Sequence, residues 1–154
     1  MIAFPAFAKE PQQPPPIGLV EHVELSFQKA RIPVDVKVDT GAATSSLHAI
    51  DIKVTKDIVR FRFSKNGEVY EAPLVRRGKV KSSDGESEGR YFVEAKICTG
   101  SIRHPILISL NDRSKMKYPM LLGRDFLRGK FLVDSSSQNL LPKPSCDFQA
   151  SMFF

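Results

Sequence analysis

The sequence lacks several features that would assign it to common classes of protein. It contains no tryptophan, only two cysteines, and no apolar run near the roughly 20 residues that a membrane-spanning helix needs. It has no His-Glu-x-x-His or Cys-x-x-Cys motif, and no glycine-rich phosphate loop ending in Lys-Ser or Lys-Thr. The histidines His22, His48 and His104 are single and widely spaced. We therefore expect no metal site, no cofactor and no membrane span.

The two cysteines and the N-terminus bear on the compartment in which the protein works. Cys98 and Cys146 could bridge in an oxidising compartment or remain two thiols in a reducing one, and the sequence leaves both open. Residues 1–8 are apolar and end in Ala-Phe-Ala before Lys9, a pattern typical of a signal-peptidase site. We interpret them as a signal-peptide remnant, which predicts a periplasmic or secreted protein. The alternative is an ordinary apolar N-terminus on a cytoplasmic protein.

Length and charge are compatible with one soluble domain. The 154 residues are enough for a single domain with a sizeable core. The net charge of +6 favours acidic partners, although a basic charge spread along the chain also describes an ordinary solvated surface. Residues 10–16, EPQQPPP, predict an extended linker. We divide the chain into a signal-peptide remnant and proline-rich linker at 1–16, a folded domain at 17–135 and a tail at 136–154.

Most segments after residue 17 have the two-residue period of β-strands. The Asn66-Gly67 pair is the strongest short signal for a hairpin turn, and the polar stretch 81–89 predicts a projecting hairpin tip. Gly129 should end a short helix that begins near Arg124. We expect Asp125 to cap this helix and Arg124 to form a structural ion pair. This pattern predicts an all-β barrel, and the lack of an internal repeat argues against two lobes with one aspartate each. Strands are expected at residues 19–27, 34–38, 59–63, 68–72, 74–80, 90–97, 102–110, 120–122 and 131–133, the last of them in the core.

The most informative stretch is Asp39-Thr40-Gly41-Ala42, which follows the alternating strand at 34–38. A strand that ends in Asp-Thr-Gly carries a carboxylate on a tight turn, where Gly41 permits close backbone approach or positive φ. Two such carboxylates within hydrogen-bond range share a proton and can activate a water molecule, as in aspartic peptidases. The chain contains a single Asp-Thr-Gly, so a second copy of the chain would have to supply the partner.

Two longer segments extend this pattern. Residues 38–47 read VDTGAATSSL, and residues 112–127 read DRSKMKYPMLLGRDFL. Together with the region 77–90, they resemble the RimB-like family of retropepsin relatives, which often carries the label "ATP-dependent zinc protease". The resemblance covers roughly residues 17–135 and implies a closed acid-protease barrel that forms one active site as a homodimer. The zinc and ATP of that label find no support in the motifs of this sequence.

The resemblance also assigns roles to single residues. It implies that Asp39 is the catalytic aspartate and that Thr40 braces the two catalytic turns across the dimer axis. It implies that Gly41 and Ala42 line the substrate cleft. It puts residues 122–124 beneath the catalytic loop.

The flap that the resemblance implies would span residues 81–90 and is flanked by basic side chains. Members of the family are associated with ligases that add glutamates to protein tails, and with the trimming of those tails. Because arginine binds carboxylates in a bidentate manner, we predict Arg77, Arg90 and Arg113 as clamps for substrate carboxylates. The alternative is that these are solvated surface arginines.

Three functions remain as hypotheses. The favoured one is a homodimeric aspartic peptidase, with acidic or glutamate-rich peptides as expected substrates. The second is a non-catalytic peptide-binding module on the same barrel. The third, a barrel that binds nucleic acid, is the weakest. The alternate spacing of Phe61 and Phe63 in one strand favours core packing over a platform on which bases would stack.

Overall fold

The computed structural model describes residues 2–4, 12–82 and 84–146. Within them the chain forms, in order, β1 (Pro16–Ile17), β2 (Val20–Phe27), β3 (Ala30–Val38), β4 (Ser45–His48), β5 (Ile50–Thr55), β6 (Ile58–Arg62), β7 (Tyr70–Lys81), β8 (Ser87–Thr99), β9 (Ile102–Asn111), β10 (Met120–Leu122), α1 (Arg124–Leu127) and β11 (Leu132–Val133).

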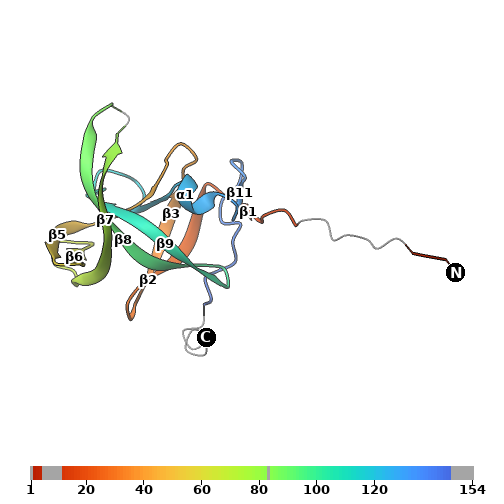
Figure 1. The fold of residues 1–154 in the computed structure, drawn as a ribbon, viewed down its shortest axis with the longest axis horizontal. Helices are drawn as coiled ribbons and strands as arrows, with labels where there is room; N and C mark the ends of the chain where they lie inside the picture. The colour runs from red at the N-terminus through yellow and green to blue at the C-terminus, as the bar shows by residue number, and fades with distance from the viewer. Residues whose placement is uncertain (1, 5–11, 83, 147–154) are drawn as a thin grey trace.

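Six of these strands close into a barrel. They follow the order β2-β3-β10-β4-β9-β8, and the barrel closes because β8 also pairs with β2. Strands β7, β6 and β5 continue the sheet beyond β8. Figure 1 shows the long β7–β8 hairpin projecting from the body of the molecule. The prediction of an all-β closed barrel with one short helix near the C-terminus is confirmed.

The core follows from the alternation of side chains along each strand. In β3, Val34, Val36 and Val38 are buried while Asp35 and Lys37 face solvent. Burial of these valines therefore fixes how the end of β3 sits in the barrel wall. The residue that follows Val38 emerges at the rim of the barrel.

Strand β10 brings two distant parts of the sequence together. It pairs parallel to β3 and antiparallel to β4, with Leu122 opposite Val38. The amide of Asp39 donates to the carbonyl oxygen of Leu122 at 2.9 Å. The segment after β10 is thereby held beside the turn after β3.

Some elements differ from the sequence-based predictions. Residues 68–72 and 74–80, expected as two strands, belong to the single strand β7, in which a bulge at Val75 takes the place of a break. Strands β1, β4 and β5 were not predicted. The first two are too short to show an alternation, whereas β5 alternates Ile50, Ile52 and Val54 with polar residues and was missed. Strand β11, expected in the core, pairs with β1 and leaves Leu132 half exposed.

The predicted N-terminal segments fall partly outside the described residues. Residues 1 and 5–11 include most of the signal-peptide remnant and the first two residues of the linker, so both remain predictions. In the described part of the chain, no helix is long and apolar enough to cross a membrane.

Candidate active site

The turn after β3 presents Asp39 at the rim of the barrel. Asp39 is partly exposed, and its Oδ1 accepts a hydrogen bond from the amide of Gly41 at 2.9 Å. Its carbonyl oxygen accepts a second one from the amide of Ala42 at 3.2 Å. The carboxylate therefore stabilises its own turn, as an Asx turn does, and still reaches solvent.

Gly41 lies where the backbone passes close to the carboxylate. A Cβ at this position would lie 3.1 Å from Oδ1 of Asp39. Gly41 does not have a positive φ, so the first of the two predicted reasons for this glycine applies and the second does not. Thr40 is exposed at the surface, and its bracing role across a dimer axis remains a prediction.

The segment after β10 lies directly beneath this turn, as the resemblance implied. The amide of Arg124 donates to the carbonyl oxygen of Ala42 at 2.9 Å. A Cβ on Gly123 would lie 2.6 Å from the carbonyl oxygen of Thr44, closer than two such atoms can approach. Only glycine allows the two backbones to cross here.

Two side chains of α1 connect the helix to its surroundings in unexpected ways. Arg124, expected in an ion pair, donates from Nη1 to the carbonyl oxygen of Thr40 at 3.0 Å. Asp125, expected to cap the helix, is not its N-cap residue, which is Gly123, but its Oδ1 accepts a hydrogen bond from the first-turn amide of Phe126 at 2.8 Å. The same Oδ1 also accepts a hydrogen bond from the buried Ser45 hydroxyl at 3.0 Å. The Arg124 bond holds the helix against the Asp39 turn, and the Ser45 bond holds it against β4.

A cavity of about 490 Å³ lies beside the turn. Residues 41–44 line one side of it, and residues 80–82 of the β7–β8 hairpin line another. The hairpin therefore occupies the place of the predicted flap (Figure 1).

Cationic side chains dominate the border of this cavity, which we call the basic cavity. Arg90 has a side chain that is only 12% exposed, with Nη1 donating to the Ser109 hydroxyl at 3.3 Å and Nη2 lying 3.5 Å from the Glu88 carboxylate. Concentrated positive charge in a half-enclosed space favours an anionic ligand. The cationic residues that border the cavity are Arg76, Lys79, Lys81, Arg90 and Arg113.

Arg113 is mainly an internal residue of this site. It is 8% exposed, and it donates from Nε to the carbonyl oxygen of Tyr118 at 3.3 Å and from Nη1 to the Ser46 hydroxyl at 3.2 Å. Burial and the charge of Arg90 lower the pKa of Arg113, while the negative charge of Asp39 raises it. Arg113 therefore lies within electrostatic reach of Asp39, but two of its donors already have partners inside the protein.

Arg77 does not border the basic cavity, whereas its neighbour Arg76 does. The guanidinium carbon of Arg77 lies 5.7 Å from the ring centroid of Tyr91. That of Arg76 lies 3.8 Å from the ring centroid of Phe92, which also borders the cavity. The geometry thus favours Arg76, which the sequence analysis missed, over Arg77 as a residue that meets a ligand.

The bulge at Val75 explains this exchange. Before the bulge, Leu74 lies opposite Val93, and a regular ladder continued from there would bring Arg77 opposite Arg90. The extra residue shifts the register by one, so Gly78 lies opposite Arg90 instead. No feature of the sequence marks Val75 as a bulge.

Two other hypotheses can be compared with the geometry. In the described part of the chain, no three His, Cys, Asp or Glu side chains gather as a metal site would require. These residues do not fit the zinc of the family label, and we derive no step through a metal. Phe61 is fully buried and contacts Phe27 at a centroid distance of 5.3 Å, so it is not available to stack on bases.

Known proteins can now be compared with this geometry. Residues 17–144 match the family described as RimB-like, retropepsin-like aspartic endopeptidase RimB. The chain belongs to this RimB-like family. A solved structure from Legionella pneumophila, of a protein with unknown function, has the same fold with a TM-score of 0.66 and 30% sequence identity. The match covers 82% of this chain and 97% of that one. The family predicted from the two motifs is confirmed.

Curated relatives of this RimB-like chain are much longer proteins. A "probable alpha-L-glutamate ligase" from Shewanella pealeana is 34% identical over 121 residues, which are 67% of this chain and 25% of the relative. A protein with the same name from Parasynechococcus marenigrum is 33% identical over 118 residues, 70% of this chain and 25% of the relative. The chain thus spans about a quarter of the length of these relatives.

Proposed function

We propose that this chain is one half of an aspartic peptidase, in which the Asp39 side chains of two copies form a single catalytic pair. The observation that carries the proposal is a partly exposed Asp39, held on a tight turn beside the basic cavity. Membership of a retropepsin-like family supports it. The chain supplies one Asp-Thr-Gly, so the proposal requires a homodimer.

The proposed reaction needs only the two carboxylates and a water molecule. Two carboxylates held close together share one proton, because both cannot ionise cheaply. The ionised Asp39 takes a proton from water as its oxygen attacks the scissile carbonyl carbon, and the protonated one donates to the carbonyl oxygen. Collapse of the tetrahedral intermediate breaks the C–N bond, and a proton passes to the leaving nitrogen. The products are a carboxylic acid and an amine.

We propose acidic, glutamate-rich peptides as substrates. The basic cavity supports this, because Arg76 and Arg90 border it and guanidinium groups bind carboxylates well. The curated relatives support it independently, since their printed name is that of ligases for glutamate. A ligase that adds glutamate and a peptidase that acts on glutamate-rich peptides would meet the same chemical group.

A non-catalytic peptide-binding module remains a second candidate. The ligase names of the relatives favour it, because a domain of a ligase could hold an acidic chain without cutting it. The two candidates differ in what Asp39 must do. A peptidase needs the Asp39 carboxylate for chemistry, whereas a binding module needs mainly the cations of the basic cavity.

A digest of acidic and neutral peptide libraries from acid to neutral pH tests the proposal. We expect cleavage of acidic peptides by the wild-type protein and a loss of about 10²- to 10⁴-fold in the Asp39→Asn variant, with binding retained. Because a mixed dimer would carry one aspartate, excess Asp39→Asn protein should suppress the activity per wild-type subunit. Equal cleavage by the variant would refute the catalytic role. Binding without cleavage by either protein would favour the binding module.

We also propose that the protein works in an oxidising compartment such as the periplasm. A disulfide between Cys98 and Cys146 supports this, since such bonds persist where thiols are not kept reduced. Non-reducing electrophoresis of protein taken from fractionated cells checks it. A fully reduced cytoplasmic pool would favour the alternative.

A further inference from the structure

The residues after β11 lie against the barrel instead of leaving it. We call residues 137–146 the strap. Near its start, the carbonyl oxygen of Ser137 accepts a hydrogen bond from the amide of Leu19 at 2.8 Å. Two residues later, the amide of Asn139 donates to the carbonyl oxygen of Val20 at 2.9 Å. The strap therefore follows the backbone at the beginning of β2.

A buried carboxylate holds the middle of the strap. Glu21 is fully buried, and its Oε2 accepts hydrogen bonds from the amides of Gly18 at 2.7 Å and Leu140 at 3.0 Å. Its Oε1 accepts from the amide of Leu141 at 3.0 Å. Backbone amides that converge on a buried carboxylate stabilise it strongly, and they join the strap to the start of β2. The proposed reaction makes no use of Glu21.

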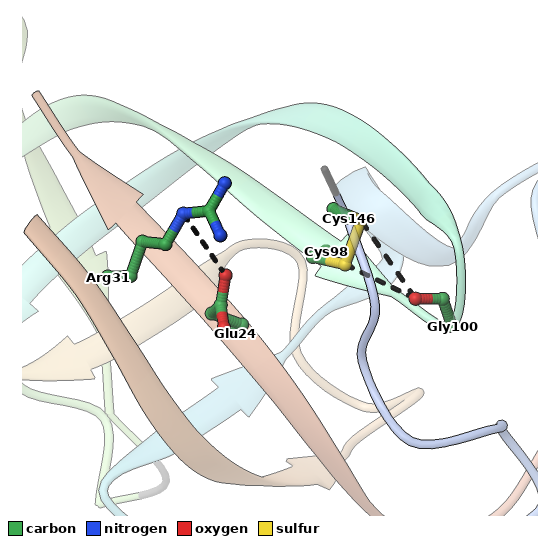
Figure 2. The surroundings of a disulfide bond; sticks show 5 residues. All are labelled: Glu24, Arg31, Cys98, Gly100 and Cys146. Carbon is green, nitrogen blue, oxygen red and sulfur yellow. Dashed lines mark hydrogen bonds and ion pairs between the residues drawn. A yellow bond between two sulfur atoms is a disulfide. The ribbon is translucent and has the colours of Figure 1, made fainter. Parts of the chain in front are cut away.

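A disulfide closes the far end of the strap. Cys146 is joined to Cys98 near the end of β8, with their Cα atoms 6.0 Å apart (Figure 2). The amide of Ser145 also donates to the carbonyl oxygen of Gly100 at 2.7 Å. Cys98 is buried whereas Cys146 is partly exposed, so Cys146 is the half of the disulfide that lies nearer to solvent.

The strap connects to the catalytic turn through one residue. Leu19, whose amide donates to the strap, accepts a hydrogen bond at its carbonyl oxygen from the amide of Val38 at 2.8 Å. Val38 is the last residue of β3 and immediately precedes Asp39. The strap is therefore two backbone hydrogen bonds away from the residue that enters the Asp39 turn.

We propose that the strap positions the Asp39 turn and that the Cys98–Cys146 disulfide is its redox-controlled clasp, meaning the covalent bond that keeps the strap against the barrel. Dithiothreitol would transfer two electrons and two protons, break the S–S bond to give two thiols, and itself become a cyclic disulfide. Without the bond, the strap is held by its hydrogen bonds and by the packing of Leu141 against the core, so it opens more often, and the backbone before Asp39 then loses its support.

Residue-specific amide hydrogen exchange, measured by NMR on the full chain, tests the clasp. We expect reduction, or the Cys146→Ser variant, to speed exchange at Leu141 and at Val38 by about tenfold or more. The core amide of Ile108 in β9 should keep its rate, which shows that the barrel stays folded. Glu21→Gln, which puts an NH₂ group against donor amides, should have the same effect with the disulfide intact. Glu94→Gln, at an exposed position on β8, is the matched control.

The results that would overturn the proposal are separate from those that concern catalysis. If Leu141 exchanges faster after reduction but Val38 does not, the strap does not position the turn. If neither changes, the disulfide is not a clasp. The expected loss of peptidase activity on reduction rests on the proposed function, whereas the exchange rates do not. If the protein has no peptidase activity but still shows faster exchange at both Leu141 and Val38 after reduction, the proposed peptidase function is refuted and the proposed role of the strap stands.

Discussion

Two regions of this molecule treat charge in opposite ways. The basic cavity beside Asp39 is bordered by five cationic side chains and opens to solvent. At the strap, the buried carboxylate of Glu21 has three backbone amides as partners, and a disulfide closes the segment that supplies two of them. A region whose polar groups are satisfied internally is suited to holding structure, and a region with concentrated charge is suited to binding.

The largest effect on stability should come from the strap side of this comparison. The disulfide spans 48 residues, so its loss in Cys146→Ser should lower the free energy of unfolding by roughly 2–4 kcal/mol. Urea unfolding of the wild-type protein with and without dithiothreitol measures the change. Dithiothreitol should not alter the stability of the variant, and a wild-type protein indifferent to reductant would contradict the prediction.

The close approach of the Gly123 and Thr44 backbones beneath the Asp39 turn should affect the free energy of unfolding nearly as strongly. Gly123→Ala would place a Cβ 2.6 Å from the carbonyl oxygen of Thr44 and should cost about 1–3 kcal/mol of unfolding free energy. Gly89→Ala is the matched control, because a Cβ there meets no atom within 4 Å. Equal stability of the two variants in urea would show that the backbones can separate without cost.

The binding side of the comparison can be tested with neighbouring arginines. Arg76→Ala and Arg90→Ala should each raise KM for an acidic peptide about ten- to a hundredfold, because each removes a charged hydrogen-bond donor from the basic cavity. Arg77→Ala should change KM by less than about twofold, since Arg77 lies over Tyr91 and outside the cavity. An Arg77 effect as large as that of Arg76 would contradict the bulged register.

The smallest effect should appear in the pH dependence of stability. Burial, followed by the charge of Lys130, lowers the pKa of His104, which lies edge-on to Phe126 at a centroid distance of 5.7 Å. The unfolded chain then binds more protons than the folded one near the ordinary histidine pKa of about 6.5. This contribution to stability should be present above about pH 6.5 and be lost as the pH falls through the lowered pKa. When the free energy of unfolding in urea is plotted against pH across this range, it should rise less steeply for His104→Gln than for wild type.

Local patterns were sufficient to predict several parts of the fold. The turn at Asn66-Gly67, the short helix before Gly129 and the strand before Asp39 each depend on neighbouring residues, and each was found. Strand β11 was misjudged because burial depends on which strand pairs with it. Glu21 shares the face of Val23, Leu25 and Phe27 in β2, but nothing in the sequence indicated a partner that would let a carboxylate be buried there. Its amide partners come from a segment far along the chain.

The sequence by itself determined that Asp39 stands on a tight turn after a buried strand, because this depends on side-chain alternation and turn residues over a short stretch. The place of the Gly123 segment beneath that turn was implied by the resemblance to the RimB-like family. Only the tertiary structure decided that Arg76 replaces Arg77 at the cavity, that Glu21 is buried, and that Cys98 meets Cys146. These depend on the register of paired strands and on where the barrel closes, and one inserted residue in β7 is enough to change which side chain borders the basic cavity.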